Sequence, residues 1–335
     1  MSSSIIIKPP APWQRRGPQR RNRVALFLLV LFASTSISTA CEDRRSPLGP
    51  SDPGSSNPRL ALEVTQQWSP YVGVQVTGEA LEAYQDALSL LLRSGQLKGV
   101  RVEISRGSLA AGARVIKAIG ALGVELLGLI SNEYLFDQDI EQVIDRIFAM
   151  YPEIRYFQVG NEITTILPTS GPTMTIERYM AVFQRIYDHV QTRYPGRAIL
   201  LTQSTLGFSL YGPTELETMA ELGLADMDPT KVIIAINDYE PQSATQYVGL
   251  LGSTLRRYRV WVTESGVANP DAHIGFVQGG YPLLRNYLRA ERIYWFVMWG
   301  GDSGSDTDFS LIKNPGSYPD YWTSPLFRLL TGSSN

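Results

Sequence analysis

The sequence has very few of the residues that cross-link a protein or bind a transition metal. It contains one cysteine and two histidines among 335 residues. One cysteine rules out an internal disulfide, and so few nitrogen and sulfur ligands argue against a zinc site. We therefore expect no metal and no cofactor. The chemistry of this chain must then rest on oxygen-bearing side chains.

The N-terminal region lacks an apolar run long enough to cross a membrane. Its apolar run, residues 24–33, holds ten residues, whereas a helix that spans a bilayer needs roughly 20. Residues 1–40 contain six Lys or Arg and no acidic residue, and all six precede this run. That order is typical of a signal peptide that is cleaved, and the sequence predicts one over residues 1–40.

The end of the predicted signal peptide is Ser38-Thr39-Ala40, followed by Cys41. Small residues before the only cysteine resemble a bacterial lipoprotein signal, whose cysteine is lipidated after cleavage. Ser38 stands where such signals usually have an aliphatic residue, and small residues also precede an ordinary signal peptidase site. The sequence thus predicts export and leaves two alternatives open. One is a cell-surface lipoprotein attached to a membrane through Cys41, and the other is a periplasmic or secreted protein.

Positive charge is scarce in the rest of the chain. Without residues 1–40 the chain has 24 basic and 32 acidic residues, a formal net charge of −8. Nucleic acid is not an expected partner, because neutralising phosphates requires clustered Lys and Arg. Residues 42–59 are rich in Pro, Ser and Gly and contain one large aliphatic residue, Leu48. This composition predicts a flexible linker at 41–60, before one catalytic domain at 61–335.

Beyond residue 70 the chain alternates short apolar runs with helical patterns, and the runs start 25 to 43 residues apart, the spacing of repeated βα units. Eight strands are predicted: 72–76, 100–104, 125–130, 155–159, 198–202, 232–236, 259–263 and 293–299. No strand leads into the Gly-x-Gly-x-x-Gly turn of open dinucleotide-binding sheets. The sequence therefore predicts an α/β fold, a single (β/α)₈ TIM barrel, with functional residues at the carboxyl ends of its strands.

Two of the predicted strands end in a carboxylate. The fourth ends in Gly-Asn-Glu (residues 160–162), and the seventh ends in Thr-Glu-Ser-Gly (residues 263–266). Either motif alone is compatible with an ordinary surface acid. A charged side chain after an apolar strand must be solvated, paired or used, and two separately placed carboxylates are what glycoside hydrolysis requires. Their joint placement favours a catalytic interpretation.

These two strand ends resemble those of the clan A glycoside hydrolases, and the resemblance extends over roughly residues 70–325. It implies a retaining glycoside hydrolase that cleaves β-linked poly- or oligosaccharide through a covalent glycosyl-enzyme intermediate. Glu162 would be the acid/base and Glu264 the nucleophile. Asn161 would hydrogen-bond the 2-hydroxyl of the sugar that is cleaved.

Other strand ends match the same family less closely. Tyr239 stands where the clan usually has a tyrosine that hydrogen-bonds the nucleophile, with a tyrosine on the rim as the alternative. Trp299, at the end of the eighth predicted strand, stands where the family places an indole beneath the sugar; core packing is the alternative. Arg101 resembles an arginine held close to the nucleophile, and an ion pair with Glu103 is the alternative. Asn237 stands where some members have histidine, so its role stays open.

Two other functions compete with hydrolysis of a glycosidic bond. The first is an exported carbohydrate-binding protein, that is, a barrel without catalytic activity; the presence of both carboxylates argues against it. The second is a serine hydrolase that uses Ser209. The segment around Ser209 lacks the second glycine of a nucleophile elbow, which argues against this function.

Overall fold

The computed structural model describes residues 58–74, 81–106, 109–164, 173–207, 211–301 and 305–333. The predicted signal peptide, Cys41 and Ser209 lie outside these ranges. Helix α2 (Pro58–Gln67) begins inside the predicted linker, so its first three residues overlap the end of the range 41–60. Among the described helices, none combines the length and the apolar character that a membrane crossing requires.

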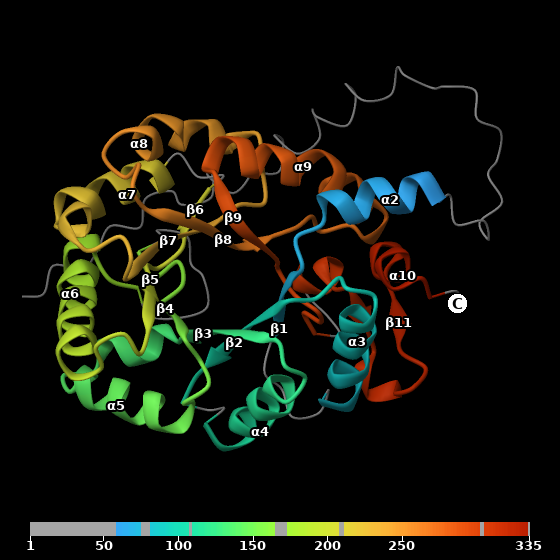
Figure 1. The fold of residues 1–335 in the computed structure, drawn as a ribbon, viewed down its shortest axis with the longest axis horizontal. Helices are drawn as coiled ribbons and strands as arrows, with labels where there is room; N and C mark the ends of the chain where they lie inside the picture. Colours follow the sequence, from blue (N-terminus) through green and yellow to red (C-terminus); the bar gives the residue numbers. More distant parts are fainter. Residues whose placement is uncertain are drawn as a thin grey trace, which may run out of the picture. The chain divides into compact units, whose positions relative to one another are not determined.

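The strands form one closed parallel barrel (Figure 1). They are β1 (Tyr71–Val74), β2 (Gly99–Ile104), β3 (Glu125–Ile130), β4 (Tyr156–Val159), β5 (Ile199–Leu201), β6 (Thr205–Leu206), β7 (Val232–Asn237), β8 (Arg259–Ser265) and β9 (Ala290–Trp295). Strand β1 pairs with β9 and closes the ring. Strands β5 and β6 both pair with β7 and share one position, so the barrel has eight positions. The predicted TIM barrel is confirmed.

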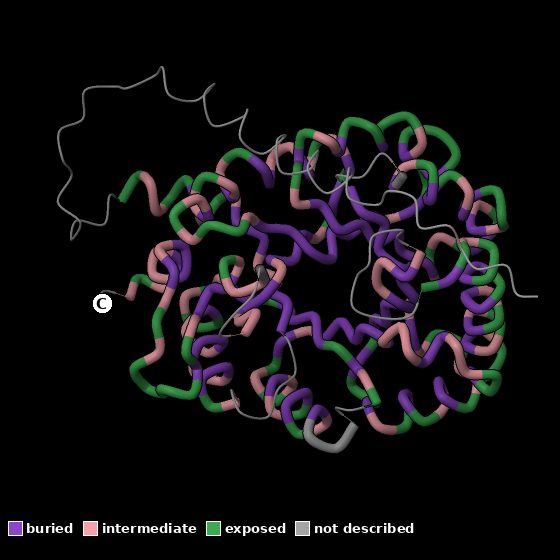
Figure 2. The backbone as a smooth tube through the Cα atoms, turned by 180° about the vertical axis from the view of Figure 1, so that it is seen from behind, coloured by how far each residue is buried: buried purple, intermediate pink, exposed green. Residues whose placement is uncertain are grey.

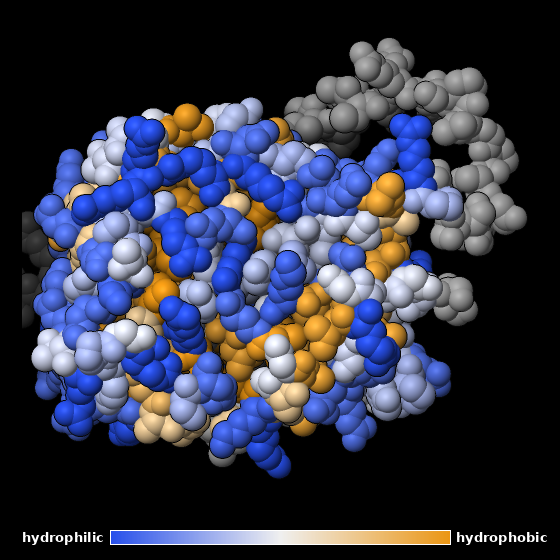
Figure 3. Space-filling view, in the orientation of Figure 1, coloured by the Kyte–Doolittle hydropathy of each residue, from blue (hydrophilic) through white to orange (hydrophobic). Residues whose placement is uncertain are grey.

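Helices surround the barrel in sequence order. They are α3 (Leu81–Arg93), α4 (Leu109–Gly120), α5 (Ile140–Met150), α6 (Ile176–Arg193), α7 (Tyr211–Glu221), α8 (Val248–Gly252), α9 (His273–Leu288) and α10 (Pro325–Thr331). In α5 the residues at helical spacing, such as Ile140, Val143 and Ile147, are buried. Figure 2 shows buried residues along the strands and exposed ones on the outer sides of the helices. Hydrophilic side chains cover most of the face drawn in Figure 3, with apolar residues gathered below its centre.

The amino-terminal half of the barrel interior is filled with side chains. An inner apolar cluster comprises Leu127, Tyr156, Leu201, Ile233, Ala235, Trp261 and Tyr294. The guanidinium group of Arg292 lies 3.8 Å from the centre of the Trp261 ring and pairs with Glu125. This half is therefore closed by apolar side chains together with the Arg292–Glu125 pair.

The last barrel strand differs from its prediction. It covers Ala290–Trp295 rather than 293–299, and its register against β8 shifts twice. Beyond Trp295 the backbone passes so close to Gly73 that a Cβ atom there would lie 2.0 Å from the Phe296 carbonyl oxygen. Beyond the regular strand, the Phe296 N–H still donates to the Ser265 carbonyl oxygen at 2.7 Å and the Met298 N–H to the Gly73 carbonyl oxygen at 2.8 Å, but Trp299 lies outside β9. The prediction that Trp299 closes the eighth strand was therefore wrong.

Candidate active site

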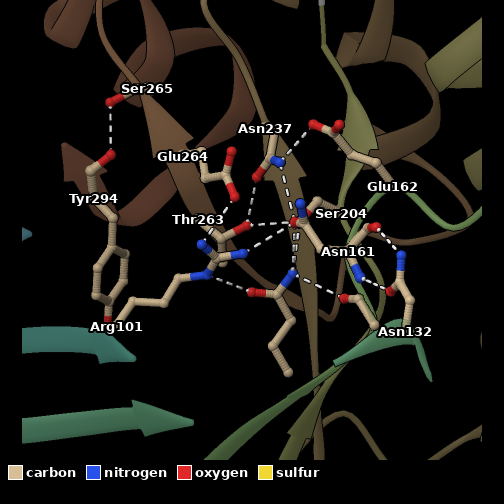
Figure 4. Close-up of polar contacts among 12 residues, drawn as sticks. Arg101, Asn132, Asn161, Glu162, Ser204, Asn237, Thr263, Glu264, Ser265 and Tyr294 are labelled. Carbon is tan, nitrogen blue, oxygen red and sulfur yellow. Dashed lines mark hydrogen bonds and ion pairs between the residues drawn. The ribbon is translucent and has the colours of Figure 1, made fainter. Parts of the chain in front are cut away.

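The two carboxylates singled out by the sequence lie at the same end of the barrel. Glu162 lies in the turn that follows β4, three residues beyond the end of that strand, and Glu264 is the sixth residue of β8. Glu264 is buried, with 6% of its surface exposed, and Glu162 is partly exposed. Figure 4 shows both side chains in one polar cluster, with Asn237 between them.

The turn that carries Glu162 has an unusual backbone. Glu162 has a φ of 49° and Gly160 a φ of 80°, so both lie in the left-handed region. Asn132 holds the turn on one side: its Oδ1 accepts from the Asn161 N–H at 2.8 Å, and its Nδ2 donates to the Asn161 carbonyl oxygen at 2.8 Å. A non-glycine residue with this φ costs of order 1–3 kcal/mol and persists where its surroundings over-determine the conformation.

Each oxygen of Glu264 has its own partner. Arg101 Nη1 lies 2.8 Å from Glu264 Oε1, and the Tyr239 hydroxyl donates to Glu264 Oε2 at 2.6 Å. Burial, reinforced by the negative charges of Glu264 and Glu162, raises the pKa of Tyr239 well above its ordinary value, so the phenol stays a neutral donor. Arg101 pairs with Glu264, whereas Glu103, on the same face of β2, is exposed.

Glu162 is held by a different kind of partner. Asn237 Nδ2 donates to Glu162 Oε1 at 2.7 Å, and the Thr263 hydroxyl donates to Asn237 Oδ1 at 2.9 Å, which fixes the orientation of the amide. Burial and, second, the charge of Glu264 raise the pKa of Glu162 to about 7. A carboxyl group with this pKa keeps its proton close to neutral pH, as a general acid must.

The side-chain oxygen of Asn161 accepts hydrogen bonds from several side chains. It accepts from Arg101 Nη2 at 3.0 Å, Gln158 Nε2 at 3.2 Å, Ser204 Oγ at 2.9 Å and Asn237 Nδ2 at 3.2 Å. Guanidinium and amide nitrogens can only donate, so these contacts identify the acceptor end of the Asn161 amide. Its Nδ2 donor occupies the other corner of the amide.

The structure brings together five of the six predicted barrel-site residues, namely Arg101, Asn161, Glu162, Tyr239 and Glu264. The sixth, Trp299, contacts Tyr84 of α3, with ring centroids 6.3 Å apart. Among the described residues, the indole nitrogen of Trp299 has no hydrogen-bond partner. Two aromatic rings meet the Tyr239 ring edge to face, Phe296 with centroids 5.8 Å apart and Phe309 with centroids 5.4 Å apart.

Sequence reasoning missed several polar members of the cluster. Gln158, Ser204 and Thr263 are fully buried and form hydrogen bonds within it, and Asn237, whose role was open, bonds Glu162. The available signal was a glutamine inside the otherwise apolar strand β4. Within the part of the chain that the structure describes, no three His, Cys, Asp or Glu side chains are grouped as a metal site.

No protein-family model and no curated protein matches this sequence. Solved structures do resemble it. An endo-β-1,6-glucanase has a TM-score of 0.56 at 8% identity, covering 79% of this chain and 75% of its own. An endo-β-1,4-glucanase from Xanthomonas axonopodis pv. citri has a TM-score of 0.52 at 14% identity, covering 78% and 97%.

A third similar structure is an exo-β-1,3-glucanase from Aureobasidium namibiae, of the glycoside hydrolase group GH128. Its TM-score is 0.52 at 10% identity, and the match covers 76% of this chain and 94% of that one. Identities this low show a shared fold rather than a shared activity. The chain thus has the (β/α)₈ barrel fold that is also found in solved glycoside hydrolases.

Proposed function

We propose that this protein is a retaining glycoside hydrolase that acts on β-linked poly- or oligosaccharide, with Glu162 as the acid/base and Glu264 as the nucleophile. The observation that carries the proposal is the contrast between the two carboxyl groups. Glu264 faces a guanidinium group and a phenol, whereas burial and the charge of Glu264 raise the pKa of Glu162 to about 7. Two carboxyl groups with opposite environments support an assignment of acid and nucleophile.

In the first step Glu264 attacks the anomeric carbon and the glycosidic C–O bond breaks. Glu162 gives its proton to the departing oxygen, and the sugar remains as an ester on Glu264. In the second step water attacks the anomeric carbon, Glu162 takes a proton from that water, and the ester bond breaks. Two displacements retain the anomeric configuration.

The stereochemical outcome tests this route directly. Retention requires carboxyl groups about 5 to 5.5 Å apart, whereas a separation of roughly 6.5 to 9.5 Å leaves room for a water and gives inversion. NMR of the first sugar released shows its anomeric form before mutarotation. A product with the inverted configuration would exclude the covalent intermediate.

The substrate class is proposed from chemistry and from the similar structures. Their names record action on β-1,6-, β-1,4- and β-1,3-linked glucans. The described cluster contains one cation, Arg101, and its charge is paired with Glu264. Because this charge is already paired, the cluster favours neutral sugars over acidic ones. For location, we propose export after removal of residues 1–40, with Cys41 as the lipidation site if the protein is held at a membrane.

The decisive experiment replaces Glu264 with Gln and measures hydrolysis of aryl β-glycosides. We expect a loss of about 10³-fold or more in kcat, because the nucleophile is removed. Glu217→Gln, a change of an exposed acid on α7, is the matched control and should keep full activity. Unchanged activity of the Glu264 variant would overturn the assignment. Binding of oligosaccharide by the native protein without turnover would favour the carbohydrate-binding alternative.

A further inference from the structure

The peptide that follows Glu162 is held by a buried glutamine. The N–H of Ile163 donates to Gln203 Oε1 at 2.9 Å, and the N–H of Thr164 points to the same oxygen at 3.4 Å. Gln203 is fully buried and lies between β5 and β6. One side chain therefore fixes the backbone on the carboxyl side of Glu162, opposite to the side that Asn132 holds.

The other end of the Gln203 amide is also engaged. Its Nε2 donates to the Thr164 hydroxyl oxygen at 2.5 Å. The Thr164 hydroxyl also affects Glu215 of α7, a buried carboxyl group with 8% of its surface exposed: burial raises the pKa of Glu215 to about 7, and the hydroxyl acts in the opposite direction. Both ends of the Gln203 amide are therefore bonded to the segment Ile163–Thr164.

The backbone of Gln203 is tied to the strand that leads to Glu162. The Gln203 N–H donates to the Tyr179 hydroxyl at 2.5 Å, and that hydroxyl donates to the carbonyl oxygen of Val159 at 3.1 Å. Val159 is the last residue of β4. The segment from Val159 to Thr164 is thus attached at both ends to Gln203, and the left-handed Glu162 lies between the attachments.

We propose that Gln203 is a positioning residue for Glu162, and that Thr164 holds its amide in place. This inference rests on the proposed function. Gln203 is not a catalytic residue, because its contacts are with the backbone and with Thr164. Its effect is to keep the carboxyl group of Glu162 in line with the oxygen that it protonates, where a displacement of about 1 Å can cost on the order of 100-fold in rate.

The test compares two substrates that differ in their need for an acid. 2,4-Dinitrophenyl β-glycosides have a leaving group that departs without protonation, whereas unsubstituted phenyl β-glycosides need the proton of Glu162. For Gln203→Met and for Thr164→Val, we expect kcat/KM on the phenyl glycoside to fall about 10-fold or more. On the dinitrophenyl glycoside we expect a change within about twofold, because kcat/KM reports the first step alone.

Thr331→Val is the matched control for Thr164→Val. Thr331 is also partly exposed, and its hydroxyl bonds the Phe327 carbonyl oxygen within α10. It should leave both substrates unaffected. Thermal denaturation shows whether Gln203→Met and Thr164→Val fold. If one of them does not, the two substrates are compared with the other. An equal loss on both substrates, or no loss on either, would overturn the proposal.

The result can be separated from the proposed function through Glu162 itself. Glu162→Ala should lower kcat/KM on the phenyl glycoside far more than on the dinitrophenyl glycoside. If it does and the Gln203 and Thr164 variants do not, the positioning role is wrong and the acid/base assignment stands. If Glu162→Ala affects both substrates equally, the acid/base assignment fails.

Discussion

At the scale of single residues, the two carboxyl groups differ by what touches them. Arg101 and Tyr239 each contact one oxygen of Glu264, while Asn237 contacts Glu162. Asn237 also donates to Asn161, so the environments of Glu162 and Asn161 share one amide. A change in any of these side chains should therefore alter more than one contact.

Removing the hydroxyl of Tyr239 tests its contact with Glu264. Tyr239→Phe keeps the ring beside Phe296 and deletes the donor that lies 2.6 Å from Glu264 Oε2. We expect kcat to fall roughly 10- to 100-fold, since a preorganised donor at a reacting carboxylate is lost. Tyr287→Phe in α9, a partly exposed tyrosine, is the control. Steady-state kinetics on an aryl β-glycoside give the comparison, and equal rates for the two variants would contradict a role for the hydroxyl.

The pH dependence of activity should report Glu162. Its pKa is raised to about 7, so under the proposed function kcat/KM should fall as pH rises through about 7 and Glu162 loses its proton. The charge of Glu215 contributes to this elevation. Glu215→Gln removes that charge, so the alkaline limb should move to lower pH. A pH–rate profile measures the limb, and a shift to higher pH would show that Glu215 acts in another way.

The residues predicted from the sequence are those that occupy strand ends within recognisable motifs, such as Glu162 and Glu264. Gln158 and Gln203 escaped prediction for a physical reason. Their importance comes from partners 46 residues away at Ser204 and 40 residues away at Ile163, and no local pattern encodes such contacts. The end of the last strand was misplaced at Trp299 because β9 ends earlier than its apolar run does, and the substrate-binding role of Trp299 stays a prediction.

At the scale of elements, the barrel closes where β1 meets β9, and Gly73 permits that closure. A Cβ atom at Gly73 would lie 2.0 Å from the Phe296 carbonyl oxygen. Periodicity of apolar residues located every barrel position, because a buried parallel strand is an apolar run between helices. It placed the end of β9 at Trp299, four residues too late, because the apolar run continues beyond the regular strand.

Gly73→Ala should destabilise the fold by about 2 kcal/mol or more, because backbone must move to make room for the methyl group. Gly279→Ala is the matched control, since a Cβ atom there meets nothing within 4 Å and the residue lies inside α9. The control should gain about 0.5 to 1 kcal/mol from helix propensity. Urea denaturation of both variants gives the free energies of unfolding. Similar values for the two would show that the β1–β9 seam tolerates a side chain.

At the scale of the whole molecule, buried carboxyl groups link stability to pH. Burial is the largest cause that raises the pKa of Glu162, Glu215 and Asp238, each to about 7. Among the described residues, Asp238 Oδ2 has no hydrogen-bond partner. In the unfolded chain these groups titrate near 4. Their contribution to stability is therefore complete below about pH 4 and is lost as pH rises through about 7.

Asp238→Asn should weaken this dependence. The amide cannot ionise, so between pH 5 and 8 the loss of unfolding free energy should be smaller than in the native chain by more than about 1 kcal/mol. Thermal melts across this range provide the measurement. Asp226→Asn, at an exposed position, is the control and should reproduce the native slope. The same slope in the Asp238 variant would mean that Asp238 is ionised throughout.

Because the backbone at Glu162 is left-handed, stability and the proposed function favour different amino acids at this position. The φ of 49° suits glycine, and the partly buried side chain favours a group without charge. Selection for thermal stability alone would put glycine there, whereas under the proposed function selection for acid catalysis would keep glutamate. Directed evolution toward higher melting temperature, without a screen for activity, should therefore recover substitutions at residue 162 early. Under the proposed function, each of these variants should be inactive.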